Sequence, residues 1–101
     1  MSPRGLLVVG SGKRVRETAL PALLRCPEGF ALRSVVARSA KTIAVEGREL
    51  EVGRLADVGP RELEGIELVY VAVGKDAAPA VLARLAELAR AKPLALLVDT
   101  P

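Results

Sequence analysis

The sequence contains no histidine and no tryptophan, and it has a single cysteine among 101 residues. The missing histidines exclude Ser-His-Asp and Cys-His catalysis, together with every metal site that uses a histidine ligand. Cys26 alone can form neither an internal disulfide nor a cysteine-rich zinc site. Aromatic residues make up only 2% of the chain, so stacking platforms for single-stranded nucleic acid are not expected. We therefore expect neither a metal site nor a catalytic residue.

Long runs of like charge and long apolar runs are also absent. Fifteen basic and twelve acidic residues give a net charge of +3, with no run of five or six like charges. We therefore expect no nucleic-acid partner. No stretch approaches the ~20 apolar residues of a membrane span, so no membrane association is expected. A free cysteine without an export signal favours the cytoplasm.

Half of the residues are hydrophobic, which predicts one folded domain over residues 1–101. Apolar runs of strand length alternate with segments of helical periodicity. Strands are expected at 5–9, 30–36, 66–73 and 94–98, helices at 13–25 and 77–91, a hairpin at 42–45 and 48–52, and a short helical turn at 57–64. Pro21 predicts a kink or a late helix start, and Gly47 a positive φ in the hairpin turn. The pattern indicates an α/β, Rossmann-like three-layer domain with a mostly parallel sheet of about five strands.

A glycine-rich turn follows the first predicted strand. Gly10, Ser11 and Gly12 lie between this strand and the next helix, as in a dinucleotide fingerprint, although Val15 stands where a third glycine would be. Lys13 and Arg14 come next, where cations are unfavourable beside a helix dipole unless an anion is bound. We predict a phosphate-bearing ligand here. The alternative is a solvated basic end of a helix.

Two further loops should lie at the same sheet edge, where ligands of such folds bind. NAD-binding units place an acidic residue at the end of the second strand, but here Ala37 takes that place. Arg38 and Ser39, with nearby Lys41, suit a 2′-phosphate and favour NADP slightly over NAD. An ordinary polar loop is the alternative. The third loop spans residues 73–76 and begins with Val73 and Gly74.

Several stretches resemble the N-terminal domain of the Gfo/Idh/MocA oxidoreductases, which are NAD(P)-dependent dehydrogenases. They are VVGSGKRVRETALPALL at 8–24, SVVARS at 34–39, ELVYVAVG at 67–74 and LLVDTP at 96–101. The resemblance covers nearly the whole chain. It implies that NAD or NADP binds here, with Val73 and Gly74 near the nicotinamide ribose.

The chain also departs from that family. Thr100 replaces the lysine that the family uses in catalysis, and the family's substrate domain is absent. The helix after the second strand is replaced by the hairpin. We therefore expect a cofactor-binding domain that is not catalytic alone and works as a homodimer or with a catalytic chain. The alternatives are a degenerate Rossmann domain that serves as an interaction or dimerisation module and, ranked lower, a methyltransferase.

Overall fold

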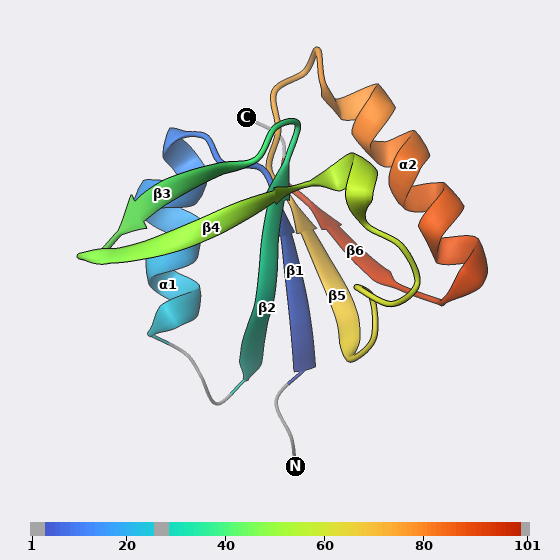
Figure 1. The fold of residues 1–101 in the computed structure, drawn as a ribbon, viewed down its shortest axis with the longest axis horizontal. Coiled ribbons are helices and arrows are strands. Elements are labelled where there is room, and N and C mark those ends of the chain that lie inside the picture. Colours follow the sequence, from blue (N-terminus) through green and yellow to red (C-terminus); the bar gives the residue numbers. More distant parts are fainter. Residues whose placement is uncertain (1–3, 26–28, 100–101) are drawn as a thin grey trace.

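The computed structural model describes residues 4–25 and 29–99, and its sheet has six strands (Figure 1). The strands are β1 (Arg4–Val9), β2 (Phe30–Ala37), β3 (Lys41–Val45), β4 (Arg48–Arg54), β5 (Ile66–Val71) and β6 (Ala95–Val98), in the order β3-β4-β2-β1-β5-β6. All neighbours are parallel except β3 and β4. The predicted mostly parallel α/β sheet is confirmed. Its six strands correspond to the six expected strand segments, against a predicted total of about five, and β3 forms an antiparallel edge.

Helices cover both faces of this sheet, as the three-layer prediction required. The helical segments are η1 (a π-helical turn, Val15–Ala19), α1 (Leu20–Leu24), η2 (a 3-10 turn, Leu55–Asp57) and α2 (Ala78–Ala91). One buried cluster lies on the side of η1 and α1, and another on the side of α2. The longest helix, α2, has 14 residues. No helix among the described residues has the length and apolar character needed to cross a membrane.

The first helix changes geometry just before Pro21. The Leu20 amide donates to the carbonyl of Val15, five residues back, and α1 follows with Pro21 in its first turn. Proline has no amide hydrogen and its ring clashes with the carbonyl four residues earlier. The wider π turn before it accommodates both effects. In place of the predicted kink or late start at Pro21, the helix widens locally over Val15–Ala19.

The β3–β4 hairpin replaces a helical crossover between β2 and β4. Its turn has positive φ at Glu46 (49°) and Gly47 (78°), as expected of a two-residue hairpin loop. Only the last residues of β4 pair with β2, from Val52 to Arg54, so most of the hairpin extends outward. Alternate residues such as Ile43 and Val45 are buried against the first helix. The predicted hairpin is confirmed.

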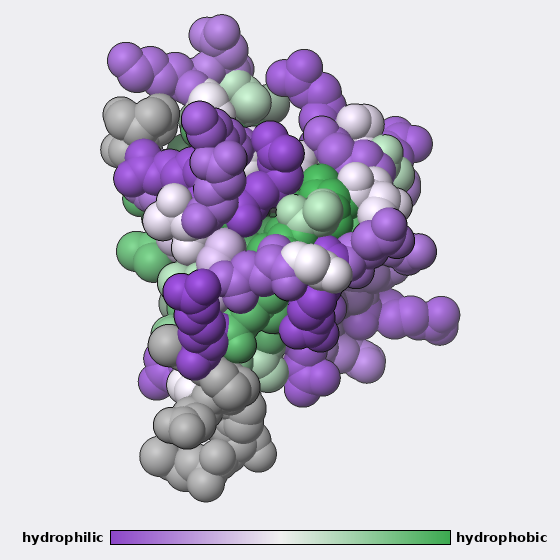
Figure 2. Space-filling model, turned by 90° about the vertical axis from the view of Figure 1, so that its left-hand side faces the viewer, coloured by the Kyte–Doolittle hydropathy of each residue, from purple (hydrophilic) through white to green (hydrophobic). Residues whose placement is uncertain are grey.

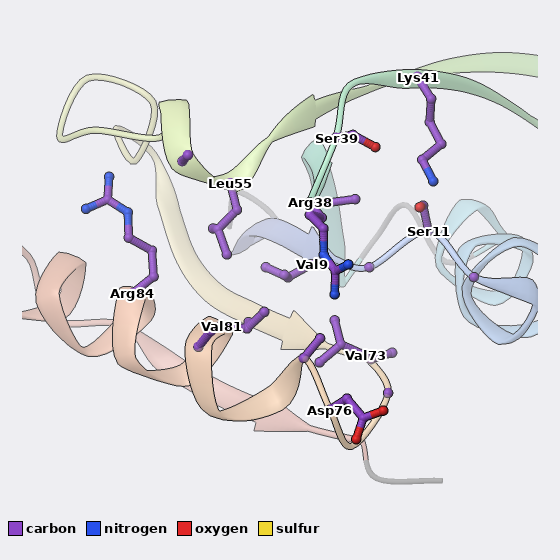
Figure 3. Close-up of a pocket in the computed structure, with 18 residues that line it drawn as sticks. Val9, Ser11, Arg38, Ser39, Lys41, Leu55, Val73, Asp76, Val81 and Arg84 are labelled. Atoms are coloured by element: carbon purple, nitrogen blue, oxygen red, sulfur yellow. The ribbon is translucent and has the colours of Figure 1, made fainter.

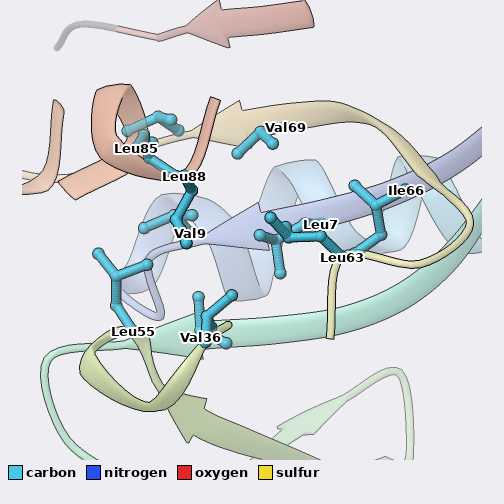
Figure 4. Packing of buried hydrophobic residues seen from close by; sticks show 11 residues of the cluster. Leu7, Val9, Val36, Leu55, Leu63, Ile66, Val69, Leu85 and Leu88 are labelled. Carbon is cyan, nitrogen blue, oxygen red and sulfur yellow. The ribbon is translucent and has the colours of Figure 1, made fainter. Parts of the chain in front are cut away.

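The segment between β4 and β5 covers the sheet face on the side of α2, with the 3-10 turn η2 but no α-helix. The helical turn expected at 57–64 is instead a series of turns, with the amides of Glu62, Leu63 and Glu64 each bonded three residues back. Gly59 and Pro60 interrupt helical propagation. Leu63 is fully buried, and with Leu55 it packs into the cluster beneath α2 (Figure 4).

The surface is uneven in polarity. The side formed by α1 and the outer ends of β3 and β4 carries mainly hydrophilic side chains, with a limited apolar area between them (Figure 2). The edge strand β6 is different, because all four of its residues are exposed. Leu96, Leu97 and Val98 are the exposed large hydrophobic side chains in the described part of the chain.

Candidate functional site

The order of the strands reverses between β1 and β5. From β1 the chain proceeds through β2 to β4 on one side, and it then returns to β5 and β6 on the other. At such a switch point the loops after the strands separate and leave a crevice. A cavity of about 780 Å³ lies there (Figure 3), and this volume is in the usual range for small-molecule sites.

Most of the predicted binding residues meet in this cavity. It is lined by Gly10, Ser11, Gly12, Arg38, Ser39, Val73 and Gly74. Lys13 and Arg14 do not line it, although they follow the same turn. The parallel pairing of β1 with β2 and β5 brings the three predicted loops together, because parallel strands place their carboxyl ends at one sheet edge.

The two glycines of the turn have different roles. Gly10 has a φ of 126°, and its amide donates to the Val36 carbonyl at 2.8 Å. A Cβ at Gly10 would lie 2.2 Å from the backbone oxygen of Ala72, so the loop after β5 requires glycine here. A Cβ at Gly12 would meet nothing within 4 Å. Packing within the chain therefore requires only the first glycine.

The charged side chains of the cavity are mainly cationic. Arg38, Lys41 and Arg84 line it, against a single acidic residue, Asp76. Lys41 extends from the start of β3 toward the loop that carries Ser11 (Figure 3). Arg38 and Lys41 are exposed and form no ion pair among the described residues. The field in the cavity therefore favours an anionic ligand.

Arg84 comes from α2 and closes one end of the cavity. Its Nη2 donates to the carbonyl of Val58 at 2.6 Å, and its Nη1 lies 3.3 Å from Oε2 of Glu87. Its Nε is buried without a partner in the described structure. The bond to Val58 ties α2 to the segment after β4 at this end of the cavity.

Sequence analysis missed the apolar end of the cavity. Leu55 and Ala56 enter after β4, and Ala77 with three residues of α2 completes the lining there. The available signal was the spacing of Ala77, Ala80, Val81 and Arg84, which is that of one helical face. This spacing alone does not show that the face borders a cavity, because the packing of α2 on β5 decides that.

A cluster of three polar side chains lies beside the glycine turn, outside the cavity. Nε of Arg14 is 3.1 Å from Oδ2 of Asp99, and the Tyr70 hydroxyl donates to the same oxygen at 2.6 Å. Burial, reinforced by the bond to Asp99 and the charge of Asp99, raises the pKa of Tyr70 to about 12, against an opposing effect of Arg14. The phenol therefore stays protonated at neutral pH. Tyr70 is partly buried at the margin of the cluster on the side of η1 and α1, and its hydroxyl keeps this polar bond.

The remaining candidates are less informative. Lys75 is exposed and borders a smaller cavity of about 250 Å³ between α2 and β6. Within the described ranges, no three acidic or cysteine side chains gather as a metal site would require. Cys26 and Thr100, singled out in the sequence, lie outside the described residues.

Comparison with known proteins defines the fold class. The sequence matches no family model and no curated protein. Among solved structures, it is similar to RSP, a Rex-family repressor, with a TM-score of 0.72 and 18% identity over 99% of this chain and 46% of RSP. RSP is also known in complex with β-NADH, and with β-NAD+ and operator DNA.

Two dehydrogenases share the same fold. A probable aspartate-semialdehyde dehydrogenase from Pseudomonas aeruginosa has a TM-score of 0.62 and 24% identity over 95% of this chain and 28% of its own. D-galactose-1-dehydrogenase from Rhizobium etli has a TM-score of 0.52 and 22% identity over 95% of this chain and 37% of its own. At these identities the likeness shows a Rossmann-like fold.

The chain spans less than half the length of each of these three proteins. The operator DNA in one RSP complex stands against the expectation of no nucleic-acid partner.

Proposed function

We propose that this chain is an NAD(P)-binding Rossmann-like domain that is not catalytic alone. The observation that carries the proposal is the cavity at the switch point, where the glycine turn meets a lining with three cationic residues and one acidic residue. Phosphate groups fit beside the turn, because Gly12 leaves room for close approach to the backbone. RSP and two dehydrogenases, which share the fold, support a nicotinamide dinucleotide as the ligand.

The end of β2 favours NADP over NAD. Ala37, which is buried, stands where a carboxylate would hold the ribose hydroxyls of NAD and repel a 2′-phosphate. Arg38, Ser39 and Lys41 line the adjoining part of the cavity. Two cations and a hydroxyl suit a phosphate dianion.

Thermal unfolding with each dinucleotide tests this proposal. A ligand at 100 times its Kd adds about 2.7 kcal/mol to the unfolding free energy, which corresponds to roughly 10–20 °C in Tm for a domain of this size. We expect NADP to raise Tm more than NAD, and nicotinamide alone to leave it unchanged. No shift with either dinucleotide at millimolar concentration would contradict the proposal.

The assignment to the Gfo/Idh/MocA family rests on the sequence stretches quoted above and stays a prediction, as does the cytoplasmic location. Hydride transfer would require a substrate site that a further domain or a partner chain supplies.

A second candidate function is self-association through β6. Edge strands normally carry charge or are covered, but β6 exposes Leu96, Leu97 and Val98, at 42, 54 and 40%. The smaller cavity continues this apolar surface, since Val98 and Leu82 line it. A second copy can add its own β6 to the free edge and bury both sets of side chains.

Analytical ultracentrifugation of Leu97→Lys tests this candidate. If β6 forms a dimer interface, we expect the native chain to sediment as a dimer and the variant as a monomer. Ala44→Lys is the matched control, because it adds the same charge to an exposed position on β3, the opposite edge strand. A native chain that stays monomeric at high micromolar concentration would refute the homodimer.

A further inference from the structure

The ion pair between Arg14 and Asp99 lies on the other side of the switch point from the cavity. The cavity includes Val73 and Val81, which pack with the cluster on the α2 side. Tyr70, which bonds to Asp99, packs with the cluster on the side of η1 and α1. The ion pair therefore joins the start of the first helix to the end of β6, across the end of β5.

This position matters because a dinucleotide has two halves. In a doubly wound sheet each half of the fold accommodates one nucleotide, and the ligand crosses between them at the switch point. Here the cavity borders the ends of β1, β2 and β5 on the face that α2 covers. A second nucleotide would have to extend past the end of β5 toward β6 and the start of the first helix, where Arg14 and Asp99 meet.

We propose that the site recognises the adenosine diphosphate half of its ligand, and that the Arg14–Asp99 ion pair determines this specificity by occupying the second half-site. This inference rests on the proposed function, because it assigns which part of the dinucleotide the chain binds. A ligand without the second nucleotide, such as ADP, then binds as tightly as the complete dinucleotide.

Several contacts hold the carboxylate in this position. The Asp99 amide donates to the Val71 carbonyl at 2.8 Å, which extends the sheet pairing by one residue. The Tyr70 hydroxyl donates to Oδ2 at 2.6 Å, and the raised pKa of this phenol keeps its proton in place. The Asp99 side chain is only 25% exposed. If the ion pair opened, Asp99 would keep only the Tyr70 hydroxyl as a side-chain partner among the described residues.

Isothermal titration calorimetry of the full chain with ADP and with NAD+ tests the inference. For the native chain we expect the two Kd values to agree within about twofold. In Asp99→Asn the ion pair is lost and the second half-site opens, so NAD+ should bind about fivefold or more tightly than ADP. Arg14→Gln breaks the same pair from an exposed position. It should therefore also make NAD+ bind more tightly than ADP, even if Asp99→Asn fails to fold.

Glu67→Gln is the matched control, since it also converts a carboxylate to an amide but lies near the opposite end of β5, exposed to solvent. Its ratio of Kd values should equal that of the native chain. A native chain that binds NAD+ tenfold more tightly than ADP, or a ratio that neither variant changes, would overturn this inference and leave dinucleotide binding intact. Absence of binding by ADP, NAD+ and NADP alike would overturn the proposed function as well.

Discussion

Gly10→Ala is expected to destabilise the fold, whereas Gly12→Ala is expected to preserve it and weaken ligand binding. At Gly10 the φ of 126° disfavours any side chain, at a cost of about 1–3 kcal/mol. The added Cβ would also overlap the Ala72 oxygen at 2.2 Å. Because Gly10 follows β1 directly and packs against Ala72 just after β5, relief of this overlap would disturb the central strand pair. We expect a fall in Tm of roughly 10 °C or more.

Gly12 provides the contrast, because the chain itself does not fill the space beside it. Its φ is not in the positive region, and an added Cβ would meet nothing within 4 Å. Alanine at an unstrained glycine position commonly stabilises by about 0.4–1 kcal/mol. The same methyl group would occupy the space that a phosphate needs. We therefore expect an unchanged or raised Tm, together with a Kd for NADP at least tenfold higher.

Circular dichroism melting and calorimetric titration of the two variants separate these effects. A Gly12→Ala variant that binds NADP with native affinity would show that the ligand does not approach the turn. A Gly10→Ala variant with native Tm would show that the loop after β5 can move away without cost.

Arg38→Ala is expected to weaken NADP binding by about tenfold or more and to leave NAD binding nearly unchanged. A hydrogen bond to a charged group contributes about 1.5–3 kcal/mol, and 1.4 kcal/mol corresponds to a factor of ten in Kd. Arg38 follows β2 directly and forms no ion pair within the described residues, so its charge is available to a ligand. Because NAD lacks the 2′-phosphate, it loses no such contact.

Competition binding of NADP against NAD measures the ratio of their two Kd values. Raised salt should reduce the preference for NADP, because it screens the exposed charges. Arg48→Ala is a suitable control, since it removes an exposed arginine from β4 at the far end of the hairpin. An equal loss of affinity for NAD and NADP in Arg38→Ala would refute the role in 2′-phosphate binding.

Local patterns predicted most of the fold. The continuous apolar runs of β1 and β5 indicated buried parallel strands, and Gly47 marked the turn of the hairpin. Pro21 marked the irregularity of the first helix. The segment after β4 was predicted less well, because its short turns are stabilised by burial of Leu63 and Leu55, which depends on residues distant in the sequence.

The candidate site was predictable to the extent that it follows from strand ends. Gly10, Arg38 and Val73 come directly after or at the end of a strand, so a parallel sheet necessarily brings them together. Leu55 and Arg84 belong to segments whose position depends on how α2 packs. The partner of Arg14 was equally hidden, since Asp99 is 85 positions away in the sequence.

The sequence by itself determined the order of strands and helices, the glycine turn and the absence of histidine chemistry, because these depend on residue type and local spacing. Only the tertiary structure decided which side chains share a cavity. It placed Arg84 at one end of that cavity and joined Arg14 to Asp99 outside it. The physical reason is that such contacts arise from packing between segments far apart in the chain, which local periodicity does not specify.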